Sequence, residues 1–229
     1  MNEIMQILQS SFGPLVLIFT VSNLFAMGLQ VRMPDVMGAL KNTKAIALIF
    51  IWGWIAGPIV GYLIVWVLPL AEPYVVVIYL CSLAPTAPFL QQMVGKAKGD
   101  MPFAGTLVPL VALGTVIFMP LLAPMMIEGV AISTWSLAKP LLLTILLPLI
   151  IGAAIRHYYD TVSTKFFPAV KLIAQLSTLL TIIWCLVLYG SSMINTAGSF
   201  ALLSMTLYMV GMAVITYYLG FGLKQAQRS

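Results

Sequence analysis

The stretch "SLAPTAPFLQQMVGKAKGD", residues 82–100, interrupts one of the most apolar parts of the chain. It overlaps the end of the run "PYVVVIYLCSL" at 73–83, which has the composition of a buried helix. Pro85 and Pro88 then stand three residues apart, with Thr86 between them. Proline removes a backbone N–H, clashes with the preceding helical turn and pushes the residue before it away from helical angles. Two prolines this close therefore predict a broken helix rather than a bent one.

The composition around this stretch predicts an integral membrane protein. Of the 229 residues, 62% are hydrophobic and 7% are charged, whereas about a quarter of the residues in an average soluble domain are charged. Eleven basic and six acidic side chains are too few to cover a water-facing surface. The apolar segments are long enough to cross a hydrocarbon core of about 30 Å as helices. We therefore expect an all-α, polytopic helical membrane protein.

Short breaks that hold nearly all the charged residues divide the chain into about seven spans. We place these spans at residues 13–31, 45–69, 74–95, 103–127, 140–155, 168–190 and 199–223. The fifth is short, and the segment 131–139 with Trp135 could extend it. We expect one membrane domain over 1–229, with a first repeat at about 11–127 and an incomplete second repeat at about 131–229. The first and sixth spans run in opposite directions and each precedes a glycine-containing span, as in an inverted repeat. The predicted fold is thus a partial inverted-repeat transporter fold with a broken third span.

Lysine and arginine residues segregate when these seven spans are threaded alternately through a membrane. Only Lys139 falls on one side. The other ten basic residues fall on the opposite side, and they are Arg32, Lys41, Lys44, Lys96, Lys98, Arg156, Lys165, Lys171, Lys224 and Arg228. Because basic loops stay cytoplasmic, we expect a multi-pass protein of the cell membrane with its N-terminus outside and its C-terminus in the cytoplasm.

The broken third span is also the predicted substrate site. Lipid cannot satisfy the free backbone groups of a broken helix, so a break is tolerated only where it is buried in protein or lines a watery cavity. The half-helix that begins near Pro88 would direct unpaired N–H groups toward that cavity, where a substrate carboxylate is a natural ligand. The predicted substrate-binding residues are Pro85, Thr86, Ala87, Pro88, Gln91, Gln92 and Asn23.

Each part of this predicted site has a competing interpretation. The third span could contain a simple proline kink, with Gln91 and Gln92 bonded to neighbouring helices. Asn23 lies well inside the first span, where an interhelical hydrogen bond is the alternative to cavity lining. Ser177 and Thr178 in the sixth span fit the same kind of packing bond.

Other motifs give no sign of enzymatic chemistry. Trp52 and Trp54 flank Gly53 inside the second span, where we expect packing rather than a binding role. The sequence has no HExxH, no glycine-rich phosphate loop, no paired acids at helical spacing and no Ser/His/Asp set. We therefore predict that the protein is not an enzyme, has no catalytic or metal-binding residues and uses no cofactor.

Three stretches together resemble a known family. They are "LAPTAPFLQQMVGKAKGD" at 83–100, the following apolar segment with "TLVPL" and "PLLAPMMI", and "FAMGLQVRMPDV" at 25–36. This pattern resembles the bile acid:sodium symporter superfamily, whose members carry a Pro-Gly-Gly-Thr-Ala-Ser-Asn break and then a basic-Gly-Asp turn. The resemblance implies a panel domain, a core domain with two crossed broken helices, and symport by alternating access. By matching position, it places Thr86 and Ala87 at the substrate-facing break, and Lys98, Gly99 and Asp100 at a cytoplasmic turn.

The chain departs from the family pattern where sodium ligands are expected. The Ser-Asn pair of the family reads Pro88-Phe89 here, and the positions after the turn read mostly Ala104 and Val108, with Thr106 the nearest oxygen. Apolar side chains cannot replace the oxygen ligands of Na⁺, so sodium coupling is doubtful. The chain also ends after the position of the eighth helix of a ten-helix member, which predicts either a fragment or a shortened fold.

Two functions from different classes follow from these features. The first is a secondary transporter of a small organic anion that works by alternating access. The alternative is a non-transporting membrane subunit, or a truncated fragment that needs a partner to complete the fold. The expected partners are the lipid bilayer, the anion, and either further copies of the chain in a homo-oligomer or the missing C-terminal helices. Nucleic acid is not an expected partner. The reading frame downstream of the Ser229 codon would distinguish the two functions.

Overall fold

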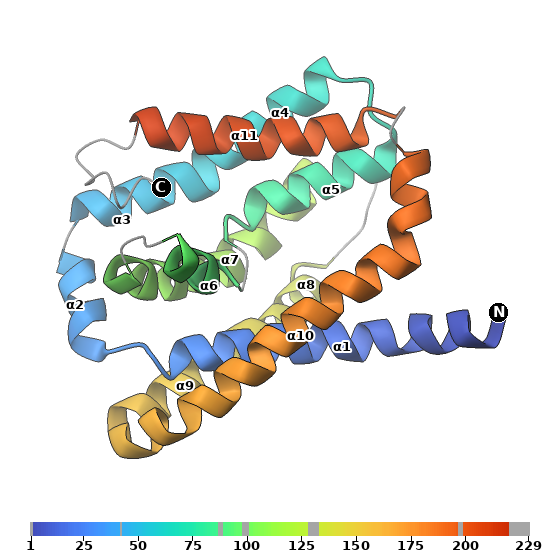
Figure 1. The fold of residues 1–229 in the computed structure, drawn as a ribbon. Coiled ribbons are helices and arrows are strands. Elements are labelled where there is room, and N and C mark those ends of the chain that lie inside the picture. The colour runs from blue at the N-terminus through green and yellow to red at the C-terminus, as the bar shows by residue number, and fades with distance from the viewer. Residues whose placement is uncertain are drawn as a thin grey trace. The chain divides into compact units, whose positions relative to one another are not determined.

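A computed structural model describes residues 2–41, 43–86, 89–97, 101–127, 133–196 and 199–219, and its regular elements are all helices (Figure 1). The helices are α1 (Asn2–Gly28), α2 (Met33–Lys41), α3 (Thr43–Phe50), α4 (Gly57–Val67), α5 (Glu72–Leu83), α6 (Leu90–Lys96), α7 (Met101–Met126), α8 (Thr134–Leu141), α9 (Leu147–Tyr158), α10 (Asp160–Asn195) and α11 (Ala201–Leu219). Two π-helical turns, η1 (Ile51–Ala56) and η2 (Leu142–Leu146), join α3 to α4 and α8 to α9. The all-α fold class is confirmed.

Six helical segments are long and apolar enough to cross a membrane within the described residues. They are Met5–Gly28, Ile46–Val67, Leu107–Met126, Thr134–Tyr158, Asp160–Ile194 and Ala201–Tyr218. Large apolar side chains on them, such as Trp66 and Met125, are exposed, as lipid-facing residues are. The protein is therefore a multi-pass membrane protein, and six of the seven predicted spans have a matching helix.

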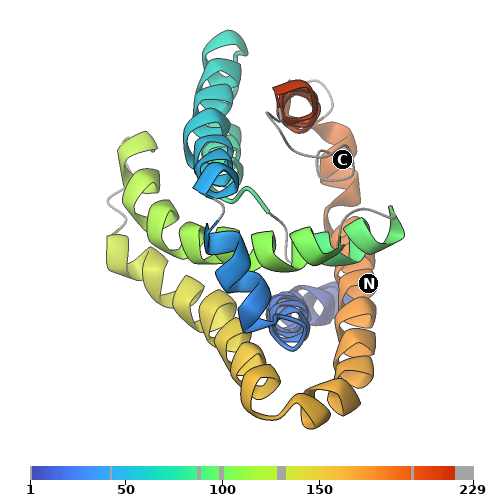
Figure 2. The same ribbon diagram turned by 90° about the vertical axis from the view of Figure 1, so that its left-hand side faces the viewer.

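The predicted third span, 74–95, is not among these six segments. Its place is taken by α5 and α6, which are separate helices of 12 and 7 residues. The predicted fifth span, in contrast, is longer than expected, because α8, η2 and α9 follow one another without a break from Thr134 to Tyr158. Figure 2 shows this segment as one continuous yellow helix.

The two π-helical turns have a common cause in the sequence. Each turn is followed by one residue and then a proline. These pairs are Gly57 and Pro58 after η1, and Leu147 and Pro148 after η2. In a regular α-helix, the proline ring would clash with the carbonyl four residues earlier. The wider turn changes the bonding, so that the Gly57 N–H donates to Trp52 O and the Leu147 N–H to Leu142 O, five residues back. A π turn thus lets each helix continue through its proline.

The helices form two compact units, and the first comprises Met1–Met33 and Pro140–Asn195. In it, α1 packs against both α9 and α10. Gly28 and Gly152 allow the α1 and α9 backbones to touch, because a Cβ on Gly152 would lie 2.6 Å from Phe25 O and 2.9 Å from Gly28 Cα. Small residues permit this close approach of membrane helices.

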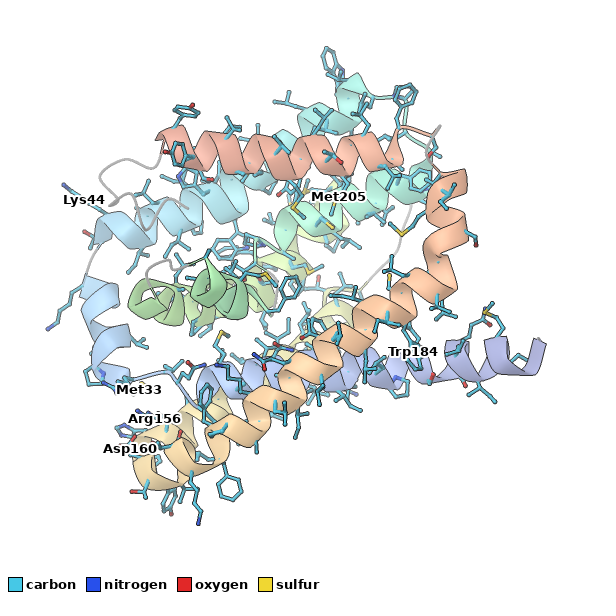
Figure 3. All side chains as sticks on the ribbon, in the orientation of Figure 1. Met33, Lys44, Arg156, Asp160, Trp184 and Met205 are labelled. Carbon is cyan, nitrogen blue, oxygen red and sulfur yellow. The ribbon has the colours of Figure 1, made fainter. Side chains whose placement is uncertain are left out.

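A hydrogen-bonded corner closes this first unit where α9 turns into α10. Arg156 pairs with Asp160 at 2.6 Å and donates to Thr164 Oγ1 at 3.1 Å. Figure 3 labels Arg156 and Asp160 side by side at this turn. The fully buried Ser163 donates to Leu29 O, 2.8 Å away, so that the start of α10 is fixed to the end of α1.

The second unit comprises the described residues of Pro34–Lys139 and Thr196–Ser229. Here α4 packs against α5 and α11, and α7 packs against α5 and α6. Its core contains Tyr79 and Leu83 of α5 together with Ala123 and Ile127 at the end of α7. The residue that ends α5, Leu83, is completely buried in this core.

Candidate functional site

The helical chain stops at Leu83 and resumes at Leu90. Ala84 caps α5 with φ −115° and ψ 74°, and its N–H donates to Cys81 O at 3.3 Å. Residues 84–86 are not helical. Pro85 explains this ending, because the residue before a proline is driven out of the helical region. The end of α5 therefore coincides with the residue before Pro85.

Three glycines of one helical segment support the chain at this ending. Gly53, Gly57 and Gly61 recur every four residues through η1 and α4. A Cβ on Gly61 would lie 3.1 Å from Ser82 Cβ, and one on Gly57 would lie 3.0 Å from Ser82 O. A Cβ on Gly53 would lie 3.2 Å from the Pro85 ring. The last turn of α5 and the first proline therefore rest directly on this backbone, and we call the three residues the glycine ridge.

A tyrosine from α11 reaches the same ridge. The hydroxyl of Tyr208, a residue that is buried, would lie 3.2 Å from a Cβ on Gly57. Ser82, whose carbonyl oxygen lies near the same point, is fully buried and donates its hydroxyl to Tyr79 O at 2.7 Å. The glycine ridge thus brings together segments that are far apart in the sequence, α5 and α11.

The six predicted site residues of the 85–92 stretch fall into three groups. Pro85 and Thr86 lie half-buried in the non-helical segment that follows α5. Gln91 and Gln92 belong to α6, but their side chains lie outside the described part of the structure. Ala87 and Pro88 lie between the described segments. Their substrate-binding role stays a prediction.

Asn23 lies in the first unit and makes interhelical hydrogen bonds. Its side-chain amide donates to Phe19 O at 2.8 Å in its own helix, and to Thr178 Oγ1 at 3.2 Å and Ala174 O at 3.4 Å in α10. This is the interhelical bond that sequence reasoning gave as the alternative to cavity lining. A substrate-binding role for Asn23 stays a prediction without a contact that supports it.

Further polar contacts extend the Asn23 bonds along the α1–α10 interface. The hydroxyls of Ser22 and Ser177 lie 3.1 Å apart. Trp184 donates its indole N–H to Ser11 Oγ at 3.1 Å, and Figure 3 labels Trp184 on α10. The predicted packing role of Ser177 and Thr178 is therefore confirmed. These bonds hold the two long helices of the first unit in one register.

The positions expected to carry sodium ligands are apolar where the structure describes them. Ala104 and Val108 are buried, with 4% and 1% of their surfaces exposed. Phe89 caps α6 and adds no side-chain oxygen. No group of three or more His, Cys, Asp or Glu side chains that could hold a metal ion occurs among the described residues. Little or no sodium dependence of transport stays a prediction.

The structure also shows one feature that sequence reasoning missed. The indole nitrogens of Trp52 and Trp54 are buried and have no hydrogen-bond partner among the described residues. Both lie in η1 and flank Gly53 of the glycine ridge. The Gly57-Pro58 pair could have indicated the π turn, but no sequence signal shows that an indole lacks a partner.

The six candidate spans of the described residues define a polytopic helical membrane protein. The chain belongs to the Sodium Bile acid symporter family, whose family model it matches over residues 14–196. The members of this family are transporters and not enzymes. A search of curated proteins found no match. The resemblance inferred from the sequence is therefore confirmed at the level of the family.

Proposed function

We propose that the protein is a secondary transporter of a small organic anion, that it works by alternating access, and that its substrate site lies at residues 84–92. The observation that carries this proposal is the interruption between Leu83 and Leu90 in a chain of membrane-spanning helices. Non-helical backbone at membrane depth is expected where it lines a cavity or is buried in protein. Transporter substrate sites are typically formed by such discontinuous helices.

The division of the chain into two compact units supports the alternating-access part of the proposal. In alternating access, one bundle of helices moves largely as a rigid body against another around a fixed site. The first unit is held together by the Asn23 bonds and the Gly28–Gly152 contact. The second is held together by the glycine ridge and the core around Leu83. Each unit therefore has the internal contacts of a body that could move as one.

The proposed topology counts α5 and α6 as two halves of one span. Seven crossings place ten of the eleven basic residues on one side, which six crossings would not do. We therefore expect Glu72 to lie outside and Lys224 in the cytoplasm. Single cysteines at 72 and 224, in a background without Cys81 and Cys185, can be labelled in intact cells with a membrane-impermeant reagent. Labelling is expected at 72 alone, and labelling at 224 alone would show that the orientation is reversed.

Replacing Thr86 tests the proposed substrate site. Thr86→Val keeps the shape of the side chain and removes its hydroxyl. Loss of a buried hydrogen bond to the substrate costs roughly 1–3 kcal/mol, so we expect KM for uptake to rise roughly five- to 150-fold. The measurement is uptake of radiolabelled cholate, with a panel of smaller monocarboxylates, by cells that express the protein.

Thr206→Val is the matched control for this experiment. The Thr206 hydroxyl donates to Leu202 O at 2.8 Å within α11, and the residue is exposed. Its removal should leave KM unchanged within about twofold. An unchanged KM in Thr86→Val would place the substrate away from residue 86. Absence of uptake of every anion by the wild-type protein would contradict the proposed function itself.

A further inference from the structure

Two buried hydrogen-bond donors in η1 have no partner among the described residues. They are the indole N–H groups of Trp52 and Trp54. A buried N–H without an acceptor destabilises a protein, and buried polar groups without a partner are few in natural proteins. Elsewhere in the chain the indole of Trp184 is satisfied by Ser11. The two donors in η1 therefore need an explanation.

Their surroundings connect them to the interruption after α5. Both tryptophans flank Gly53, whose missing side chain makes room for Pro85. Neighbouring residues in a helical turn project about a quarter of a turn to either side, so the Cα–Cβ bonds of Trp52 and Trp54 leave η1 on either side of Gly53. A π turn within a longer helix is itself frequent at functional sites. The donors thus lie next to the segment that is proposed to bind the substrate.

The two tryptophans differ in how exposed they are as residues, although both indole nitrogens are buried. Trp54 is 7% exposed, and its ring lies over Gly114 and packs against Phe118 and Phe50, with centroids 5.2 and 6.1 Å away. Trp52 is half-buried as a residue, and no aromatic ring packing is found for it among the described residues. A ligand beside Pro85 would therefore displace less protein to meet the buried N–H of Trp52 than to meet that of Trp54, which aromatic rings enclose.

The charge pattern explains why a neutral donor would serve here. Residues 45–95 contain no Lys, Arg or His, and Glu72 is their only charged residue. A cation buried at membrane depth is costly, so a carboxylate in this region must be held by neutral N–H and O–H groups. A hydrogen bond from such a donor to an ionised acceptor is shorter and stronger than one between neutral groups. An indole N–H can donate and cannot accept, which suits a carboxylate oxygen.

We propose that the indole N–H of Trp52 donates a hydrogen bond to a carboxylate oxygen of the transported anion, and that Trp54 anchors η1 to α7 without touching the substrate. This assignment rests on the proposed function, because it adds a specific donor to the same site. It makes η1 part of the site, beside the non-helical residues 84–86, of which Pro85 rests on Gly53.

The test compares three tryptophan-to-phenylalanine variants of the full-length protein, each of which keeps an aromatic ring and removes the N–H. The probe is radiolabelled cholate, and the readout is KM for uptake together with the amount of protein in the membrane. Trp52→Phe should raise KM at least tenfold. Trp54→Phe, which removes an equally buried N–H, and Trp66→Phe, which changes a ring that is 77% exposed on α4, should stay within twofold of the wild type.

A second measurement separates loss of the donor from a general disturbance. The uncharged methyl ester of cholate competes for uptake without a carboxylate, so the wild type should prefer cholate to the ester as an inhibitor. Trp52→Phe should reduce this preference, whereas a structural defect would weaken both inhibitors alike. If Trp52→Phe does not reach the membrane, Trp52→Leu, whose side chain also has no hydrogen-bond donor, takes its place in both measurements.

The results distinguish a failure of the Trp52 assignment from a failure of the proposed function. Uptake by the wild type with equal KM values in Trp52→Phe and Trp54→Phe would overturn this assignment and leave the proposed function standing. An unchanged preference for cholate over its ester in Trp52→Phe would do the same. Absence of uptake of every anion tested by the wild-type protein would remove the proposed function, and the role of Trp52 with it.

Discussion

Replacing Pro85 and Pro88 together with alanine is expected to abolish transport while leaving membrane insertion intact. The two prolines explain why α5 ends at Leu83 and α6 begins only at Leu90. Alanine restores two backbone N–H groups and is the best helix former, so the segment should straighten into one helix from α5 through α6. A straight helix would remove the free backbone groups that are proposed to face the substrate. The measurement is cholate uptake, normalised to the amount of protein in the membrane.

The matched control is a double variant at two prolines that do not interrupt a helix. Pro14 lies inside α1 and Pro168 inside α10, and both are exposed. Pro14→Ala/Pro168→Ala should therefore retain uptake. Transport by the Pro85→Ala/Pro88→Ala protein at the wild-type rate would show that the interruption is not needed for function.

Among the variants described, Gly28→Ala is expected to lower the free energy of unfolding the most. A Cβ at this position would overlap Leu149 O of α9 and lie 2.9 Å from both Ala153 N and Gly152 Cα. These are backbone atoms, so no side chain can rotate away, and α1 and α9 would have to separate. Overpacking of a tight contact typically costs 1–3 kcal/mol and occasionally more. We expect a cost of about 3 kcal/mol at this position, which corresponds to a fall in melting temperature of roughly 6–12 °C.

Gly13→Ala is the control within the same helix. Nothing lies within 4 Å of a Cβ at Gly13, and alanine is favoured over glycine in a helix interior by about 1 kcal/mol. Thermal unfolding of both variants in detergent, followed by size-exclusion chromatography, should show a lower melting temperature for Gly28→Ala alone. Equal melting temperatures would mean that α1 and α9 do not touch at Gly28.

Much of the fold could be predicted because its signals are local. Apolar length predicted seven spans, and six of them have a matching helix. Pro85 indicated the end of α5 at Leu83. The expectation that proline interrupts a helix does not hold for α7, which stays helical through Pro109, Pro120 and Pro124. Those prolines are 11 and 4 residues apart, so none of them follows another within one turn. Spacing, rather than the mere presence of proline, distinguishes a break from a tolerated proline.

Features that depend on the packing of distant segments could not be predicted. Gly57 and Gly211 looked alike in the sequence as glycines of the second and seventh spans. In the structure Gly57 touches Ser82 and Tyr208, whereas nothing lies within 4 Å of a Cβ on Gly211. Only Gly57 is therefore required for close packing, and the glycines do not support an inverted pairing of these two spans. The Asn23 bonds to α10 also depend on a neighbour that is distant in the sequence, which is why two interpretations of this residue remained open before the structure was known.

The central claim is that the interruption after α5 binds the transported anion. A cryo-electron microscopy map of the protein with cholate bound tests it most directly. We predict a chain that is non-helical over residues 84–88, with the cholate carboxylate within hydrogen-bond distance of Thr86, Trp52 or the backbone N–H groups of residues 88–91. One continuous helix from residue 76 to residue 96, packed on all sides with no cavity at Thr86, would contradict the claim.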